Sequence, residues 1–171
     1  MINIRRILVP TDFSDNAKAA VDYGCELARQ FNAELHLLNV VDSHIAAYSV
    51  EMDMFGTANH AYDIVEAQKR AVRMLDELPG LAGDGCSIVR QTELGAPCPE
   101  IARYARENDI DLIAISTHGY TGLTHFLLGS TAENIVRTAP CPVLTVRPEG
   151  HQFVNQTDDC QSKQADFSHR R

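Results

Sequence analysis

The feature that most constrains this chain is the regular alternation of short apolar segments with longer amphipathic ones. Runs dominated by aliphatic residues are typical of strands covered on both faces of a sheet. Four such runs occur, at residues 7–9, 35–41, 112–115 and 142–146. A fifth segment, residues 86–94, alternates polar and apolar side chains, which favours an edge strand. Because amphipathic segments separate all five, the sequence predicts an α/β fold, with a parallel sheet and helices on both faces.

The helices are predicted from apolar residues spaced three and four apart. The first begins at a cap, Ser14 or Asp15, and has one apolar face that consists of Ala17, Ala20, Val21, Gly24, Leu27, Ala28 and Phe31. The second covers residues 61–78, and the third begins near Pro99, because proline is favoured in a first turn. The fourth begins at a capping box, Ser130–Glu133.

Composition divides the chain into a domain at residues 1–148 and a tail at residues 149–171. The tail is rich in polar residues and holds few large hydrophobic ones, so we expect it to be disordered. Within the domain, residues 42–59 show no clean period, and we expect a functional lid or a mobile insertion there. The five cysteines form no CxxC pair, which favours free, mostly buried thiols.

Net charge and hydropathy argue against two classes of protein, nucleic-acid binders and membrane proteins. The 171 residues carry 15 Lys and Arg against 23 Asp and Glu, a formal net charge of −8. This balance counts against nucleic-acid binding, since neutralised phosphates supply most of that affinity. No apolar run approaches the roughly 18 residues of a membrane span, and the apolar stretch after the N-terminal arginines is three residues long. We therefore expect a cytoplasmic protein without a membrane or nucleic-acid partner.

Candidate ligand-binding residues follow the strands, because an open parallel sheet binds ligands outside the carboxyl ends of its strands. The glycine-bearing segment 116–129 is the most informative, since Gly119 and Gly129 allow backbone to approach a ligand closely. Ser130 and Thr131 then open a helix, whose free amides and positive end suit a phosphate-sized anion. The alternative is a capped helix with nothing bound.

Two further side chains have open alternatives. Asp12 follows the first strand and either accepts a hydrogen bond from a ribose hydroxyl or base amino group, or makes a local turn bond with Ser14. His118 either contacts a phosphate or a ligand hydroxyl, or has no role.

Several catalytic patterns are missing from the sequence. It contains no P-loop, no dinucleotide fingerprint, no nucleophile elbow, and no histidine and cysteine spacing typical of a metal site. No lysine occurs between Glu93 and Arg147, where the candidate phosphate site lies. Efficient phosphoryl transfer usually depends on such a residue, so the sequence favours binding over catalysis, with slow hydrolysis at most.

Four segments resemble the universal stress protein family, of its ATP-binding type: Arg6–Ser14, Asp111–Gly119, Leu127–Glu133 and Ala139–Leu144. The resemblance covers residues 3–148 and implies a five-stranded parallel open sheet of Rossmann-like, adenine nucleotide α-hydrolase-like arrangement. The ATP-binding members share the pattern Gly-x2-Gly-x9-Gly-Ser/Thr. Gly119, Gly129 and Ser130 match it, and Ser116 stands at the first glycine.

The resemblance implies a nucleotide site composed of Pro10, Thr11, Asp12, Val40, Ile115, Ser116, His118, Gly119, Gly129, Ser130 and Thr131. Its ligand would be ATP, with AMP and ADP as alternatives and Mg²⁺ as an accompanying ion. It also implies a homodimer through the last strand, Val143–Val146. The function expected is that of a stress-response sensor or binding module. The alternatives are a member that binds no nucleotide and acts through protein partners, and a genuine ATPase.

Overall fold

The computed structural model describes residues 2–42, 60–78, 87–117 and 129–147. These residues form one sheet of five parallel strands in the order β3-β2-β1-β4-β5. The strands are β1 (Arg6–Pro10), β2 (Glu34–Asp42), β3 (Ile88–Gly95), β4 (Leu112–Ser116) and β5 (Val143–Val146). The predicted fold class is confirmed, and the alternating segment is an edge strand, as predicted.

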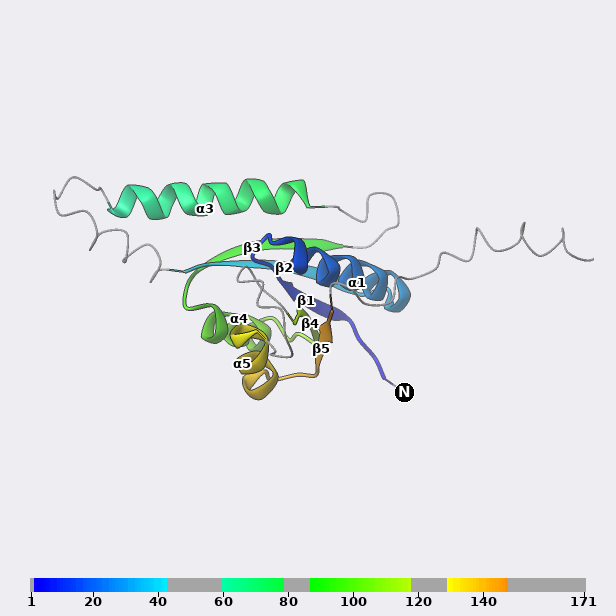
Figure 1. Cartoon of the computed structure of the whole chain (residues 1–171). Helices are drawn as coiled ribbons and strands as arrows, with labels where there is room; N and C mark the ends of the chain where they lie inside the picture. The colour runs from blue at the N-terminus through cyan, green and yellow to red at the C-terminus, as the bar shows by residue number, and fades with distance from the viewer. Residues whose placement is uncertain (1, 43–59, 79–86, 118–128, 148–171) are drawn as a thin grey trace, which may run out of the picture.

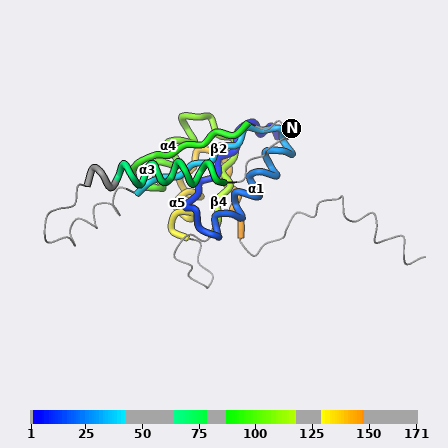
Figure 2. The backbone as a smooth tube through the Cα atoms, turned by 90° about the horizontal axis from the view of Figure 1, so that it is seen from above, coloured from blue at the N-terminus to red at the C-terminus, as the bar shows by residue number. Residues whose placement is uncertain are grey.

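Helices cover both faces of the sheet. They are α1 (Asp15–Phe31), α3 (His60–Glu77), α4 (Pro97–Glu107) and α5 (Ser130–Thr138). In Figure 1, α3 lies above the sheet and α4 and α5 lie below it. The view from above shows α1 and α3 over different parts of the sheet (Figure 2): α3 contacts β2 and β3, whereas α1 contacts the remaining strands and β2. No described helix is both long and apolar enough to span a bilayer.

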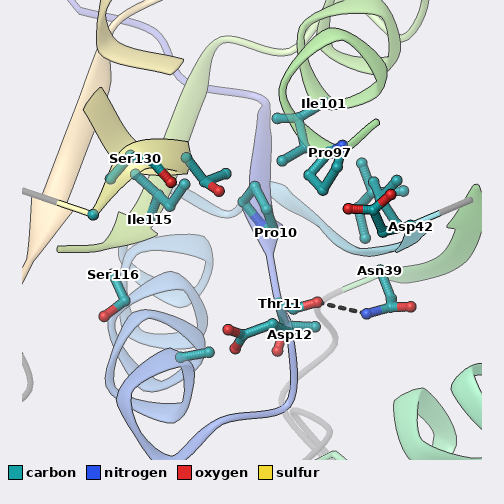
Figure 3. Close-up of a pocket in the computed structure, with 16 residues that line it drawn as sticks. Pro10, Thr11, Asp12, Asn39, Asp42, Pro97, Ile101, Ile115, Ser116 and Ser130 are labelled. Carbon is teal, nitrogen blue, oxygen red and sulfur yellow. Dashed lines mark hydrogen bonds between the residues drawn. The ribbon is translucent and has the colours of Figure 1, made fainter. Parts of the chain in front are cut away.

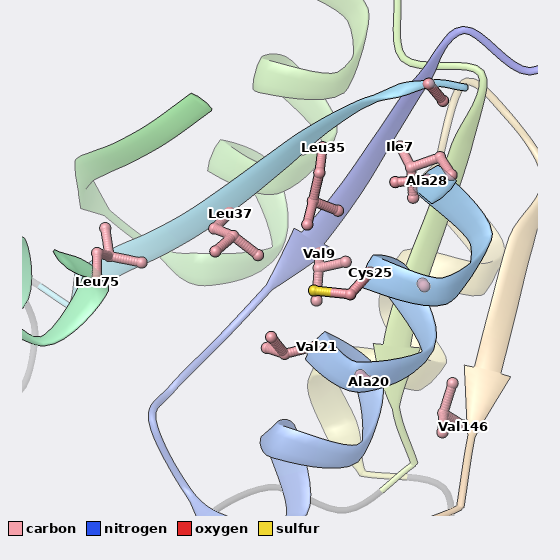
Figure 4. Close-up of a cluster of buried hydrophobic side chains, with 12 residues drawn as sticks. Ile7, Val9, Ala20, Val21, Cys25, Ala28, Leu35, Leu37, Leu75 and Val146 are labelled. Atoms are coloured by element: carbon pink, nitrogen blue, oxygen red, sulfur yellow. The ribbon is translucent and has the colours of Figure 1, made fainter. Parts of the chain in front are cut away.

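Alternate residues of the central strands β1, β2 and β4 pack into two separate cores. Ile7 and Val9 of β1 pack with α1 and α3, in the cluster that Figure 4 shows. Leu8 points to the opposite face and packs with α4 and α5. This division explains why the central strands are mostly apolar, since neither face meets water. His36 and Asn39 of β2 are buried polar exceptions.

Helix α1 packs unusually close to β1. Gly24 permits the approach, because a Cβ atom there would lie 2.4 Å from Cγ2 of Val9. Phe31, the last residue of the predicted apolar face, is 40% exposed. The helix ends at Phe31 and the chain reverses at Asn32, which has a φ of 52°. Ala33, after that reversal, fills the buried position instead.

One helix start and one helix cap differ from the prediction, although α5 begins at Ser130 as predicted. Helix α4 begins at Pro97, two residues before Pro99, although proline does occupy its first turn. The predicted capping box is also wrong, because the N-cap of α5 is Gly129. Ser130 is already helical and cannot take the extended conformation of an N-cap. Glu133 instead pairs with Arg137 at 2.7 Å.

Some predictions fall on residues outside the described ranges. These are the expected lid or insertion at residues 42–59, apart from Asp42, which is the last residue of β2, and the expected disordered tail at 149–171. The cysteines within the described ranges, Cys25, Cys98 and Cys141, are free thiols. Cys25 is buried and the other two are half-buried.

Candidate functional site

The site is a cavity of about 420 Å³ at the carboxyl ends of the strands. It lies between β1 and β4, where the sheet order reverses: from β1 the chain continues to β2 on one side, and from β4 to β5 on the other. The loops that leave these two strands therefore diverge and open a crevice. Figure 3 shows side chains that converge on it from three strands and from α4 and α5.

The β1–α1 loop supplies one wall through Thr11 and Asp12. The Thr11 N–H donates to the Leu38 carbonyl at 2.8 Å, which anchors the loop to β2. Oδ1 of Asp12 accepts two hydrogen bonds from Ser14, from N–H at 3.0 Å and from Oγ at 2.6 Å. Ser14 in turn caps α1 through Ala17. The local turn bond of Asp12 is therefore present, and the same side chain lines the cavity.

The end of β2 supplies a second wall through Leu38, Asn39, Val40 and Asp42. Leu38 directs its carbonyl toward β1, where it meets Thr11. Residues two apart in a strand direct their peptide groups to the same side, so Val40 also faces the β1 side. The pairing with β1 ends at Pro10 opposite Leu38. The N–H and C=O of Val40 thus point past the end of β1, at the cavity.

The N-terminus of α5 supplies the third wall. Gly129, Ser130, Thr131 and Ala132 all line the cavity, and Gly129 provides no side-chain cap. The Gly129 N–H donates to the Thr117 carbonyl at 2.8 Å, which joins this turn to the end of β4. The first amides of a helix have no partner within the helix and carry its positive partial charge. This wall is suited to an anion.

Apolar residues complete the cavity wall. The charged side chains in the described lining are both acidic. Pro97 and Ile101 of α4 lie near Pro10 and Ile115, as Figure 3 shows. Among the described lining residues, two carboxylates are the only ionisable groups. An anion would therefore rest on backbone amides and hydroxyls. The described ranges contain no cluster of three or more His, Cys, Asp or Glu that could hold a metal ion.

Cys98 lies directly behind the α5 wall. Its Sγ donates to the Thr131 carbonyl at 4.0 Å, a long contact even for sulfur. Burial raises the pKa of this thiol above its usual range. Cys98 is therefore a neutral packing residue at physiological pH.

The structure brings the predicted site residues together wherever it describes them. Those that line the cavity are Pro10, Thr11, Asp12, Val40, Ile115, Ser116, Gly129, Ser130 and Thr131. His118 and Gly119 lie outside the described residues. The role of all of them as nucleotide ligands stays a prediction.

The sequence analysis did not assign the rest of the lining to the site. These residues are Ala17, Leu38, Asn39, Asp42, Pro97, Ile101 and Ala132. The apolar ones look like core residues in the sequence, and nothing in their spacing separates them. Asn39 did carry a signal, because it is a polar residue near the end of a run in which only His36 is also polar. Such a residue must find a hydrogen-bond partner once it is buried.

The fold and the cavity define an open α/β protein with its ligand crevice at the switch point of the sheet. Comparison with known proteins narrows this class. The universal stress protein family matches residues 3–147. The chain belongs to the universal stress protein family.

Individual relatives agree with this assignment. Universal stress protein MJ0531 of Methanocaldococcus jannaschii is 32% identical over 148 residues, which cover 84% of this chain and 82% of that protein. Universal stress protein UspA from Lactobacillus plantarum has a TM-score of 0.62 at 28% identity, with 86% of this chain and 100% of that chain covered. A universal stress protein solved in complex with cAMP has a TM-score of 0.55 at 25% identity, with coverage of 86% and 99%.

Proposed function

We propose that this protein is a homodimeric binding module for an adenine nucleotide, ATP or a related one, held in the cavity between β1 and β4. One observation carries the proposal. The cavity has a peptide donor–acceptor pair at Val40 on one side and the uncapped N-terminus of α5 on the other. In Figure 3, Ser130 and Asp42 mark these two sides. A nucleotide has the matching polarity, with a base at one end and phosphate at the other.

The base end suits adenine. The edge of adenine offers an acceptor, N1, beside a donor, the N6 amino group. The N–H and C=O of Val40 form the complementary donor and acceptor. Guanine offers the opposite order, a donor at N1 beside an acceptor at O6, and does not match the pair in this register.

The ribose and the phosphates would lie between Asp12 and α5. Asp12 lines the cavity beside the end of β1, and its carboxylate accepts hydrogen bonds, which suits a ribose hydroxyl. The amides of Ser130 and Thr131, with their hydroxyls, would hold the phosphate at the positive end of the helix. One solved relative was determined in complex with cAMP, an adenine nucleotide, which supports this class of ligand.

Binding is a better account of the site than turnover. The described lining contains no Lys or Arg that would stabilise a transferring phosphoryl group. Two carboxylates, Asp12 and Asp42, offer the oxygen ligands that Mg²⁺ prefers, but the described residues form no preformed cage around them. In this proposal Mg²⁺ accompanies the phosphates, and hydrolysis is slow at most. The protein would respond to the nucleotide as a stress-response sensor in the cytoplasm.

The ligand proposal is tested on the purified full-length chain. Mass spectrometry of the denatured protein should detect a co-purified adenine nucleotide. The melting temperature should rise with millimolar ATP, AMP or cAMP, since a ligand at 100 times its Kd stabilises the folded protein by about 2.7 kcal/mol. GTP should leave the melting temperature unchanged. If none of the adenine nucleotides shifts the melting temperature, the proposal is contradicted, and the alternative of a protein partner remains. Phosphate release well above that of a site variant would establish an ATPase instead.

The homodimer would form through β5. This strand is an edge of the sheet, and Leu144 on it is 36% exposed. An uncovered apolar edge invites pairing with a second copy. A Leu144→Lys variant should sediment as a monomer, whereas the matched control Val72→Lys, on an exposed position of α3, should remain a dimer. A wild-type monomer at micromolar concentration would overturn this part of the proposal.

A further inference from the structure

The buried polar residue Asn39 takes a backbone partner that the sheet would otherwise use. Asn39 is only 7% exposed, and its Nδ2 donates to the Thr11 carbonyl at 2.8 Å (Figure 3). Thr11 is the first residue beyond β1, and Asn39 is the sixth of the nine residues of β2. The bond therefore joins the two elements whose ends form the base side of the cavity.

A regular parallel ladder would use the same carbonyl differently. The Thr11 N–H already donates to the Leu38 carbonyl at 2.8 Å. In a parallel ladder, the next bond runs from the N–H of Val40 to the carbonyl of Thr11. Within the described residues that bond is not formed, because the ladder stops at Pro10 opposite Leu38 and the Thr11 carbonyl meets Asn39 instead.

We infer that Asn39 is a positioning residue for base recognition: it holds the Thr11 carbonyl away from Val40 and so keeps the Val40 N–H open to the ligand. This inference rests on the proposed function. The backbone beyond Thr11 supports the same geometry, since Phe13 has a φ of 63° and donates its N–H to Thr11 Oγ1 at 3.0 Å. Without Asn39, the Thr11 carbonyl can turn to Val40 and close the donor that would read adenine N1.

The test compares two ligands in two proteins. Asn39→Leu keeps a similar volume and removes the donor. AMP and its 1-deaza analogue differ at N1, the acceptor assigned to the Val40 N–H. The wild-type protein should bind AMP about tenfold more tightly than the analogue, the value of one hydrogen bond. The variant should bind both ligands with nearly equal affinity, because AMP binding weakens about tenfold while binding of the analogue changes less than twofold.

The other outcomes are distinguishable. Equal losses for both ligands would mean that Asn39 only stabilises the loop, and an unchanged preference for AMP would mean that Val40 does not depend on Asn39. Either result overturns the inference and leaves the proposed function standing. No binding of any adenine nucleotide to the wild-type protein would overturn both.

A second measurement needs no variant and covers the case in which Asn39→Leu fails to fold. In the ligand-free wild-type protein, hydrogen exchange should show the Val40 amide exchanging much faster than the amides inside the β1–β2 ladder. AMP should slow that exchange, and the 1-deaza analogue should not. A Val40 amide that is already protected without ligand overturns the inference directly.

Discussion

The two ends of the sheet hold similar polar groups but use them in opposite ways. At the amino ends of the strands, the polar groups bond to one another. Oδ2 of Asp111 accepts from the backbone N–H groups of Arg5 and Arg6, at 2.7 and 3.0 Å. The Nδ1 and Nε2 atoms of His36 lie 2.9 Å from the Tyr104 hydroxyl and from Glu34. At the carboxyl ends, polar groups surround a cavity of about 420 Å³.

This difference separates stability from binding. A polar network that closes on itself contributes to the free energy of unfolding, because each buried group has its partner inside the protein. At the cavity, some polar groups also bond within the protein, such as Asn39 with Thr11. The first amides of α5 have no partner within the helix, so they remain donors for a ligand and the fold gains little from them. Changes at the amino end should therefore alter stability and leave nucleotide affinity unchanged, and changes at the carboxyl end should do the reverse.

The largest expected effect is at the carboxyl end, for Ser130→Asp. An acidic residue in the first turn of α5 interacts favourably with the helix dipole, so stability should rise slightly. The same charge repels a phosphate at that terminus, and nucleotide affinity should fall about 100-fold, roughly 2.7 kcal/mol. Calorimetric titration with AMP and urea unfolding measure the two quantities.

The control for this variant is Asn134→Asp, which adds the same charge to an exposed position one turn further along α5. Its affinity for AMP should stay within about threefold of wild type, because screening by water and salt weakens a more distant charge. If Ser130→Asp binds AMP as tightly as Asn134→Asp, α5 does not hold the phosphate.

The next effect in size is at the amino end, for Asp111→Ala. The variant leaves the two backbone amides of Arg5 and Arg6 without their acceptor. Hydrogen bonds to a charged group are the stronger kind, and one of these two is exposed, so we expect a loss of about 2 kcal/mol in the free energy of unfolding. Asp111→Asn keeps an oxygen acceptor and should lose about half as much. A fall in AMP affinity beyond about twofold in the folded variant would contradict the separation of the two ends.

The sequence predicted the strands and the location of the cavity, but not the side-chain partners at either end of the sheet. The strands were predicted to within about two residues, because fully apolar runs have few alternatives in an open α/β fold. The cavity was located because strand ends and glycines are visible in a sequence. Partners such as Asn39 with Thr11, or His36 with Tyr104, were not predictable, since they depend on the register between segments far apart in the chain. The capping box at Ser130 failed for a local reason: two adjacent residues, Gly129 and Ser130, can both serve as N-caps.

A smaller effect is expected for Tyr104→Phe. The variant removes only the hydroxyl and leaves Nδ1 of His36, a residue 4% exposed, without its partner. A buried polar atom that loses its hydrogen bond costs about 1.5 kcal/mol, which urea unfolding resolves. In a His36→Leu background, the same change should cost nothing or recover stability, since the hydroxyl then has no partner. Equal losses in both backgrounds would show that Tyr104 contributes only packing.

The smallest effect is the pH dependence that His36 confers on the amino end. Burial lowers the pKa of His36 below its usual range, and the hydrogen bond with Glu34 opposes this shift only in part. As pH falls below about 6.5, the unfolded chain takes up a proton that the folded chain does not, so the free energy of unfolding decreases. One such group changes the free energy of unfolding by at most about 1.4 kcal/mol per pH unit.

A His36→Gln variant isolates this contribution, because the other titrating groups remain in both proteins and cancel in the difference. The stability of wild type relative to the variant should be constant above pH 7 and fall as the solution is made more acidic. The loss should stop once the pH passes below the pKa of folded His36, where both states carry the proton. A difference that grows toward acid would mean that Glu34 outweighs burial and holds His36 protonated in the fold. In that case His36 and Glu34 would form an ion pair that acid stabilises, and the description of the amino end as a neutral hydrogen-bonded network would be wrong.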